Sequence, residues 1–269
     1  MSGDSWCFFI GESKENRQHE RMLNAFCSQI PAEKGSLIAL DPSESFHLIK
    51  VRRARIDEPV CIYNGRGCRC YGKVYLANPK AAKIIVERIE QIAVSIPRFT
   101  LAQVIPKGKS MDLVVQKATE LGVHIIQPLT SENCEMPLTV EKAEKKRQKW
   151  QSISLESVKQ CGNPFLPKIQ PLISLKEYLN SPAEKNHLKT IAALLPETQT
   201  PRTLVTKHKD ATQCSILIGP EGDFSPKEYE HALNKGFLPV TLGPLVLRAE
   251  TAGLAALSIF GNEFREESN

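Results

Sequence analysis

The alternation of apolar and polar positions in the first third of the chain is typical of short β-strands separated by turns. The strands that this pattern predicts are 36–40, 60–63, 70–75 and 83–87. Asn64-Gly65 predicts a hairpin, because both central positions of a type I′ turn need positive φ. We therefore expect a small β-rich domain over residues 1–96.

From about residue 97 the apolar period changes, and helical patterns alternate with apolar runs. Apolar residues at i, i+3, i+4, i+7 and i+10 from Met111 predict a helix that stops at Gly122. A charged helix with Trp150 on its inner face is expected over 140–161, and an Ala-rich helix over 250–261. The strands predicted between helices are 100–105, 123–129, 190–196, 214–219 and 237–243.

The order of these elements indicates the architecture of the second domain. Strands that alternate with helices favour an α/β fold with a mostly parallel sheet, here over residues 97–269. Ser225 is expected to start one helix as its N-cap, with Glu228 completing a capping box. The segment between 196 and 214 reads as a polar linker, and the tail 263–269 is expected to fray.

Composition narrows the class of protein. With 269 residues, 41% hydrophobic and 24% charged, the chain can bury a substantial core. No apolar run reaches the roughly 18 to 20 residues that a bilayer demands, so we expect no membrane partner. Eight scattered cysteines indicate reduced thiols and a cytoplasmic location. Cys61, Cys68 and Cys70 lack C-x2-C spacing, so they predict a strand with buried thiols and no metal site.

The net charge of +5 is unevenly distributed along the chain. Between residues 50 and 80 the basic residues are opposed only by Asp57 and Glu58. Such a patch could neutralise RNA phosphates, although a solvated face that serves solubility explains the charge equally well. The residues expected to contact RNA are His47, Lys50, Arg52, Arg53, Arg55, Arg66, Arg69 and Lys73, together with Lys107 and Lys109 before the Met111 helix.

Two glycine-bearing turns follow predicted strands, Gly219-Pro-Glu-Gly-Asp-Phe-Ser and Leu242-Gly-Pro-Leu-Val-Leu-Arg-Ala-Glu-Thr-Ala. Ligands bind at the carboxyl ends of strands in open α/β sheets, where glycines let a ligand approach the backbone. Neither turn matches Walker A or G-x-G-x-x-G, which disfavours nucleoside triphosphates and dinucleotides. Ordinary turns would explain the spacing as well.

The ordered set of Lys117-Ala-Thr-Glu-Leu-Gly, Trp150 with Gln160 and the two glycine-bearing turns resembles the ribosomal RNA small subunit methyltransferase E family. The segment His47-Leu-Ile-Lys-Val-Arg-Arg is also similar, so the resemblance covers nearly the whole chain. It implies a PUA-like β-barrel domain over 1–96 and a SPOUT-type α/β domain over 97–269, with a C-terminal trefoil knot within about 190–262. It further implies a homodimer that uses S-adenosylmethionine to methylate N3 of one uridine in 16S rRNA within the small ribosomal subunit.

The resemblance also implies the site residues. Those expected to bind the cofactor are Leu194, Leu195, Pro196, Gly219, Pro220, Glu221, Gly222, Leu242, Gly243, Leu247, Thr251 and Ala252. Those expected to be catalytic are Arg248 and Glu250. The chain departs from the family pattern at Asp223, where glycine is usual, and at Asn133, Asn163 and Leu245, where arginine is more usual.

The chemistry of uridine explains why Arg248 is expected to be catalytic. Uridine N3 holds a proton at neutral pH, so some group must stabilise the anion that forms when the proton leaves. A guanidinium is a permanent cation with forked donors and suits that task. Glu250 could accept the proton, orient Arg248, or only form a salt bridge at the start of a helix. Glu221 could complement the sulfonium or only pin its loop.

Two other functions fit the same residues. The fold could methylate another rRNA position, such as a ribose 2′-oxygen. Alternatively, the chain could be a non-catalytic RNA-binding or ribosome-assembly factor that kept the architecture, a reading supported only by the departures from the family pattern. Cofactor binding would distinguish an enzyme from such a factor.

Overall fold

The computed structural model describes residues 22–31, 33–134, 139–182 and 184–266. They form two compact units, and the chain passes from the first to the second between Gln91 and Ile92, close to the boundary expected at 96/97. The turn Asn64–Gly67 groups with the second unit. Residues 1–21 and 267–269, which include parts of the predicted first domain and tail, lie outside the described residues.

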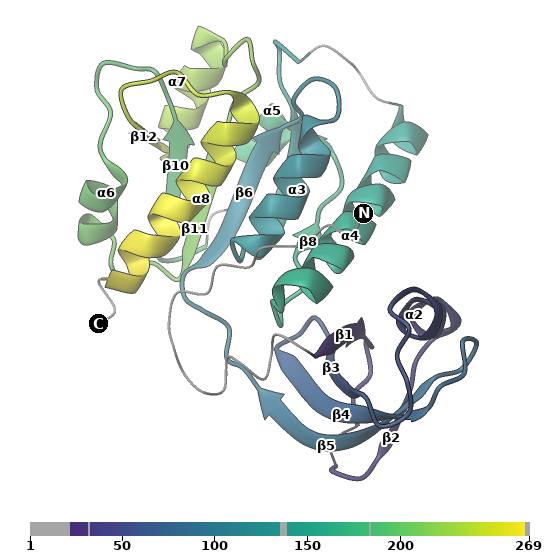
Figure 1. The fold of residues 1–269 in the computed structure, drawn as a ribbon. Coiled ribbons are helices and arrows are strands. Elements are labelled where there is room, and N and C mark those ends of the chain that lie inside the picture. The colour runs from purple at the N-terminus through teal and green to yellow at the C-terminus, as the bar shows by residue number, and fades with distance from the viewer. Residues whose placement is uncertain (1–21, 32, 135–138, 183, 267–269) are drawn as a thin grey trace. The chain divides into compact units, whose positions relative to one another are not determined.

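The first unit is built on a curled five-stranded sheet with the order β1-β3-β4-β5-β2 (Figure 1). Its strands are β1 Leu23–Phe26, β2 Leu37–Ala39, β3 Pro59–Tyr63, β4 Cys68–Leu76 and β5 Lys83–Gln91. Only β1 and β3 are parallel. A short helix α2, Pro42–Phe46, and a π-helical turn η1, His47–Val51, follow β2. The predicted strands are confirmed, and Cys61 and Cys70 are fully buried on two of them.

The predicted type I′ turn at Asn64-Gly65 is wrong in its geometry, although β3 and β4 do form a hairpin. Gly65 and Gly67 have positive φ values of 71° and 88°, whereas Asn64 does not. Instead, the Arg66 amide donates to Asn64 Oδ1 at 2.8 Å. The hairpin therefore closes through a longer loop with an Asx turn, in which the asparagine side chain replaces a backbone acceptor.

The second unit contains a seven-stranded parallel sheet. The strand order is β12-β10-β11-β6-β7-β8, with β9 also paired to β7. The strands are β6 Arg98–Val104, β7 Ile125–Thr130, β8 Lys168–Ile169, β9 Ile173–Ser174, β10 His187–Ala192, β11 Gln213–Ile218 and β12 Leu238–Val240. The predicted parallel α/β fold of this domain is thus confirmed.

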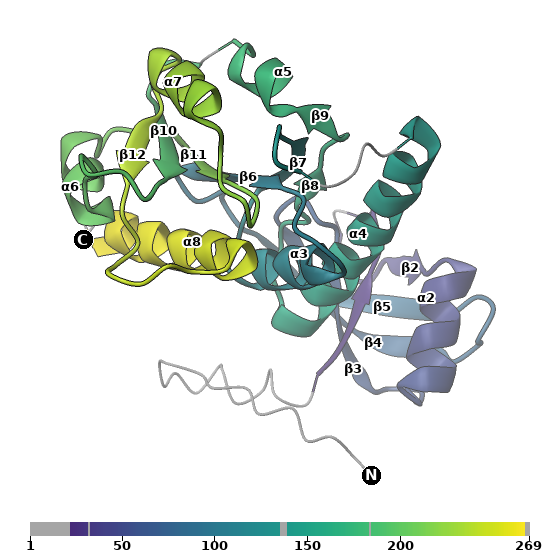
Figure 2. The ribbon, with the colours of Figure 1, turned by 90° about the horizontal axis from the view of Figure 1, so that it is seen from above.

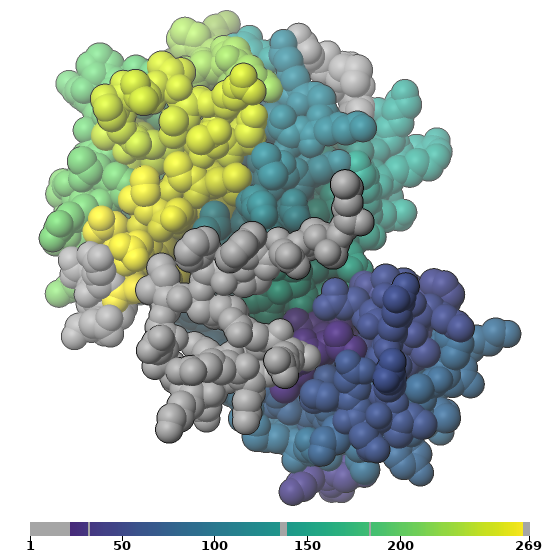
Figure 3. All heavy atoms as spheres, in the orientation of Figure 1, coloured from purple at the N-terminus to yellow at the C-terminus, as the bar shows by residue number. Residues whose placement is uncertain are grey.

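Helices cover both faces of this sheet (Figure 2). They are α3 Ser110–Glu120, α4 Val140–Cys161, α5 Leu175–Leu179, α6 Pro201–Lys207, α7 Pro226–Asn234 and α8 Ala249–Glu266. Apolar residues of α3, α4, α6 and α8 form one core with Leu101 and Ile216, while α5 and α7 form another with Ala102 and Leu217. On the surface, α8 lies beside α3 (Figure 3). None of the helices in the described parts of the chain has the length and apolarity needed to cross a membrane.

The helix ends follow local sequence signals closely. Helix α4 spans the predicted residues 140–161. Gly122, whose φ is 82°, directly follows the C-cap of α3, so this helix stops where the sequence predicts. The capping box of α7 is present, because the Glu228 amide donates to Ser225 Oγ and the Ser225 amide donates to Glu228 Oε2. The predicted polar linker is wrong, since α6 lies within it. The predicted fraying is also wrong up to Glu266, because α8 continues and buries Phe264.

Candidate functional site

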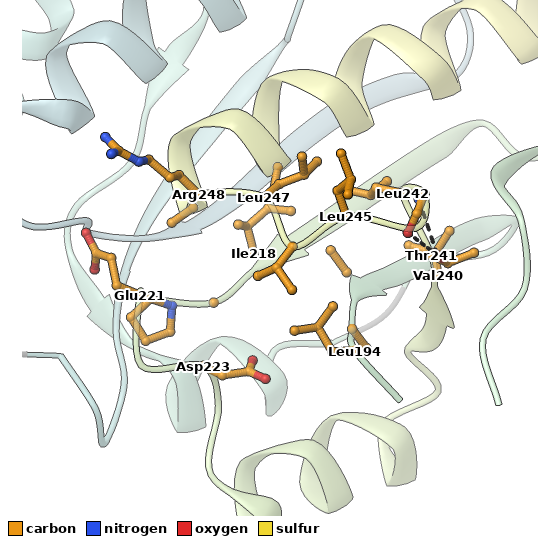
Figure 4. Close-up of a pocket in the computed structure, with 18 of the residues that line it drawn as sticks. Leu194, Ile218, Glu221, Asp223, Val240, Thr241, Leu242, Leu245, Leu247 and Arg248 are labelled. Atoms are coloured by element: carbon orange, nitrogen blue, oxygen red, sulfur yellow. Dashed lines mark hydrogen bonds between the residues drawn. The ribbon is translucent and has the colours of Figure 1, made fainter. Parts of the chain in front are cut away.

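A cavity lies where β10, β11 and β12 end. The strand register places Ala192 opposite Val240 and Ile191 opposite Leu217, so the carboxyl ends of these strands meet at one edge of the sheet. The loops that leave them enclose a cavity of about 330 Å³ (Figure 4). Its lining is Ala192, Ala193, Leu194, Ile218, Gly219, Pro220, Glu221, Asp223, Tyr229, Val240, Thr241, Leu242, Gly243, Leu245, Val246, Leu247, Arg248, Ala249 and Ala252. A volume of this size suits a small molecule.

The loop after β11 is fixed by contacts with other loops. The Lys107 amide donates to Glu221 Oε1 at 2.8 Å, which ties this loop to the one between β6 and α3. The Glu132 amide donates to Glu228 Oε1 at 2.9 Å, so the capping residue of α7 also holds the loop after β7. A Cβ on Gly219 would lie 3.1 Å from the Phe224 ring, so any larger residue would require this ring to shift. These contacts support the view that Glu221 pins its loop.

Two departures from the family pattern, Asp223 and Asn133, meet in this loop. Asp223 has a φ of 59°, a conformation that aspartate tolerates better than most side chains. Its Oδ1 accepts from the Phe224 amide at 2.8 Å and from the Tyr229 hydroxyl at 2.7 Å. Asn133 Nδ2 donates to the carbonyl oxygens of Gly222 and Asp223 at 3.2 and 2.9 Å. The loop therefore has a defined shape without a second glycine.

Tyr229 closes the cavity from the side of α7. It is only 8% exposed. Burial raises the pKa of its hydroxyl, and the hydrogen bond with the Asp223 carboxylate raises that pKa further. The hydroxyl therefore stays protonated at neutral pH and serves as a donor to Asp223.

The loop after β12 forms the other wall and carries Arg248. Thr241 Oγ1 lies 3.3 Å from both the amide nitrogen and the carbonyl oxygen of Gly243, whose φ is 129°. Leu245 and Val246 are 74% and 76% exposed although they line the cavity. Figure 4 shows the Arg248 guanidinium at the rim, on the same side as Glu221 and directed away from the apolar residues. The cavity is therefore lined mainly by apolar side chains, with the Arg248 guanidinium at its rim and the carboxylates of Glu221 and Asp223 in its wall.

Most residues predicted to bind the cofactor lie in this cavity, but some do not. Those that line it are Leu194, Gly219, Pro220, Glu221, Leu242, Gly243, Leu247 and Ala252. Leu195, Pro196, Gly222 and Thr251 belong to the same loops or to the first turn of α8 and are outside the lining. Of the predicted catalytic pair, Arg248 lines the cavity, whereas Glu250 is half-buried in the first turn of α8. Their roles in binding and catalysis stay predictions.

Sequence reasoning missed several residues of the lining. Ala192, Ile218 and Val240 are the last residues of their strands, and ends of buried strands have no distinct signal in the sequence. Tyr229 could have been found, because the capping box fixes where α7 starts and hence which of its residues lie near the preceding loop.

The basic residues predicted to contact RNA differ in their exposure and in whether they form ion pairs. Lys50, Arg52, Arg53 and Arg55 are exposed on η1 and the segment after it, where His47 is half-buried. Lys73 Nζ lies 2.8 Å from Glu87 Oε1. Arg69 is half-buried, donates to the Tyr71 hydroxyl at 3.3 Å and lies 3.8 Å from Glu90. The segment around Arg52 is therefore better suited to phosphate contacts than Arg69 or Lys73.

The remaining predicted RNA contacts lie in the second unit. Arg66 is exposed in the turn that groups with this unit. Lys107 and Lys109 are exposed in the loop before α3, and the Lys107 amide contacts the cavity loop through Glu221.

Asn163, a departure from the family pattern, donates to the Thr119 carbonyl at 3.1 Å and accepts from the Phe165 amide. It therefore has a structural role.

Comparison with known proteins identifies the family. Residues 94–261 match the RNA methyltransferase domain family. The ribosomal RNA small subunit methyltransferase E of Aquifex aeolicus is 31% identical over 85% of this chain and 96% of its own length. The chain belongs to the ribosomal RNA small subunit methyltransferase E family. The Buchnera aphidicola (Schizaphis graminum) member of this family is 29% identical over 86% of the chain and 93% of its own length.

Solved structures of methyltransferases share this fold. A methyltransferase from Legionella pneumophila, solved with bound S-adenosylmethionine, has a TM-score of 0.80 and 30% identity, and covers 90% of this chain and 98% of its own. The family member from Neisseria gonorrhoeae, bound to S-adenosylmethionine, has a TM-score of 0.80 and 27% identity, with coverages of 90% and 97%. The chain is therefore an RNA methyltransferase of this family.

Proposed function

We propose that this protein transfers the methyl group of S-adenosylmethionine to N3 of a uridine in 16S rRNA. The observation that carries the proposal is the cavity at the carboxyl ends of β10, β11 and β12, with Arg248 at its rim (Figure 4). The cavity offers apolar side chains together with charged ones at its wall and rim, which suits a small molecule with apolar and charged parts, and Arg248 suits an acceptor that becomes anionic during the reaction.

The residues of the cavity fit S-adenosylmethionine. Leu194, Leu242 and Leu247 provide apolar walls for the adenosine part. Gly243 has a backbone conformation that favours glycine, and it lets a ligand approach main-chain donors and acceptors. When bound, the cofactor supplies an electrophilic methyl group on a positively charged sulfur. Two structural relatives hold the same cofactor, which supports this assignment.

In the proposed reaction, the bond between N3 and the methyl carbon forms as the bond between that carbon and sulfur breaks, and the N3 proton leaves. Negative charge develops on N3 and on the neighbouring carbonyl oxygens. Arg248 would stabilise this charge with its forked donors. Among the described residues, no ion pair occupies its guanidinium, and the side chain is exposed, so it can meet an acceptor that arrives from solvent.

Glu250 would act beside Arg248, either by taking the N3 proton or by orienting the guanidinium. It is half-buried in the first turn of α8, two residues after Arg248. In the described part of the chain Glu250 forms no salt bridge with Arg248, so the orienting role and the purely structural alternative both lack their expected contact, and proton transfer is the role that we favour.

We further propose the finer architecture of the family for this chain. A trefoil knot within 190–262 is supported by the strand order, in which β10 lies between β11 and β12, and by the packing of α8 against α3, α6 and β11. A PUA-like barrel is supported by the curled sheet of the first unit. A homodimer is supported by the exposed Leu245 and Val246 beside the cavity, which a second copy could cover.

The proposed substrate is 16S rRNA within the small ribosomal subunit, which implies a cytoplasmic enzyme. An enzyme that modifies a base must remove it from the stack, so folded RNA is a better substrate than a free nucleotide. The exposed Lys50, Arg52 and Arg55 of the first unit, and Lys107 and Lys109 near the cavity, would bind phosphates.

Nucleoside analysis of 16S rRNA tests this proposal. In cells without the protein, mass spectrometry should show loss of 3-methyluridine, and wild-type protein should restore it while Arg248→Ala should not. Loss of a ribose-methylated nucleoside instead would indicate that the protein methylates a ribose 2′-oxygen of the rRNA. An unchanged set of modified nucleosides would favour a non-catalytic RNA-binding factor.

A further inference from the structure

Asp223 places a carboxylate in the cavity wall where the family pattern has glycine. Figure 4 shows this carboxylate directed toward Leu194 and away from Glu221 and Arg248. The side chain is held in place, because Oδ1 accepts hydrogen bonds from the Phe224 amide and the Tyr229 hydroxyl at 2.8 and 2.7 Å. In the described chain, Oδ2 receives no hydrogen bond, so one oxygen of a fixed carboxylate is available to a ligand.

The negative charge of Asp223 has no cationic partner in the described residues. Glu221 is the other carboxylate of the lining, and it is bound by the Lys107 amide. Arg248 is the cation of the lining, and its guanidinium points away from Asp223 in Figure 4. Asn133 contacts the loop with a neutral amide at a position where the family pattern has arginine. A cation in a partly buried cavity would therefore meet an uncompensated charge that is only weakly screened.

We propose that the Asp223 carboxylate binds a cationic group of the methyl donor. This inference rests on the proposed function, because S-adenosylmethionine carries two such groups, the sulfonium and the α-ammonium. After transfer the sulfur is neutral, and S-adenosylhomocysteine retains only the ammonium. Contact with the sulfonium would make the enzyme prefer substrate over product, whereas contact with the ammonium would strengthen binding of both.

Calorimetric titration of the full chain with both ligands tests the proposal. Asp223→Asn keeps an acceptor for Phe224 and Tyr229 and tolerates the positive φ, so it removes the charge alone. Asp223→Gly is a second variant that suits the backbone and secures the test if the first unfolds. Glu230→Gln is the matched control, because it removes an exposed carboxylate of α7 that is not part of the cavity.

Both Asp223 variants should bind S-adenosylmethionine about tenfold more weakly, as expected for the loss of one charge-assisted contact. Glu230→Gln should bind like the wild type. Unchanged binding of S-adenosylhomocysteine would assign the contact to the sulfonium, and equal weakening would assign it to the ammonium. Asp223 variants that bind S-adenosylmethionine within about twofold of the wild type overturn this inference alone. A wild type that does not bind S-adenosylmethionine overturns the proposed function together with the inference.

Discussion

Among single residues, Arg248 is expected to affect methyl transfer much more than cofactor binding. Its guanidinium lies at the rim and away from the apolar interior, so it should contribute more to the acceptor than to the cofactor (Figure 4). Arg248→Ala should lower single-turnover methyl transfer by about 10² to 10³, as expected when one donor to a developing anion is lost. Cofactor affinity from calorimetry should change little. Arg248→Lys keeps the charge but loses the forked donors, so its transfer rate should lie between those of the wild type and Arg248→Ala. Near-normal transfer by Arg248→Ala would contradict the proposed role.

His124 makes stability depend on pH. Its Nδ1 accepts from the Phe99 amide at 3.1 Å, which requires the neutral ring, and burial together with the nearby Arg98 lowers its pKa from 6.5 to about 4. At pH values between about 4 and 6.5, His124 is therefore protonated in the unfolded state and neutral in the folded state. The contribution of His124 to the free energy of unfolding is full above pH 6.5 and is lost as the pH falls towards 4.

Urea unfolding between pH 7.5 and 4 measures this effect. The wild type should lose up to about 1.4 kcal/mol per pH unit from this group below pH 6.5. His124→Asn keeps an acceptor for Phe99 without a titrating ring, so its stability should depend less on pH. Equal pH dependence of the two proteins would show that His124 is not the group responsible.

At the scale of secondary-structure elements, two glycines of α8 differ in what surrounds them. A Cβ on Gly253 would lie 2.7 Å from Gln103 Oε1, in a fully buried amide whose Nε2 donates to the Val104 carbonyl. A Cβ on Gly261 would meet only the Arg265 side chain, at 4.0 Å. The first glycine therefore lies in close contact with the buried Gln103 side chain of β6, and the second has no close neighbour.

Substitution by alanine should therefore have opposite effects at these positions. Gly261→Ala should raise the free energy of unfolding by about 0.5–1 kcal/mol, because glycine is a poor helix former. Gly253→Ala should lower it by about 1–3 kcal/mol, because a tightly packed core must shift. Thermal or urea unfolding of the two variants gives the comparison. Stabilisation by both would mean that the contact with Gln103 is easily relieved.

Elements with strong local signals could be predicted from the sequence, and those fixed by tertiary packing could not. Helices α4 and α7 were predicted closely, because their capping residues and apolar faces are local features. Helix α6 was missed in a polar segment, although Thr200 caps it and Pro201 starts it. The end of α8 was missed because Phe264 packs against Phe99, which is distant in the sequence, with ring centroids 6.0 Å apart.

At the scale of the whole molecule, topology decides the composition of the cavity. The motif loops could be predicted to lie at strand ends, but the strand order that brings Ala192, Ile218 and Val240 together comes only from the fold. The contact between Asn133 and Asp223 likewise joins two loops that are distant in the sequence. Individual motifs therefore indicated the site, and the strand order determined which of their residues meet.

The binding of RNA should depend on cations that lack a carboxylate partner. Arg52 is exposed with no ion pair among the described residues, whereas Lys73 is paired with Glu87. Arg52→Ala should weaken binding of a 16S rRNA fragment and reduce the slope of log affinity against log salt by about one. Lys73→Ala should have a smaller effect. Filter binding over a range of KCl concentrations would contradict this account if Arg52→Ala left the slope unchanged.

The position of the bound methyl donor decides whether the cavity at the ends of β10, β11 and β12 is the cofactor site. A crystal structure of the protein with S-adenosylmethionine should show the ligand between the loops that follow β10, β11 and β12, in contact with Leu194, Gly219 and Gly243. Its methyl group should face the side of the cavity where Arg248 lies. Density for the ligand elsewhere on the molecule, or a methyl group directed away from Arg248, would contradict the account.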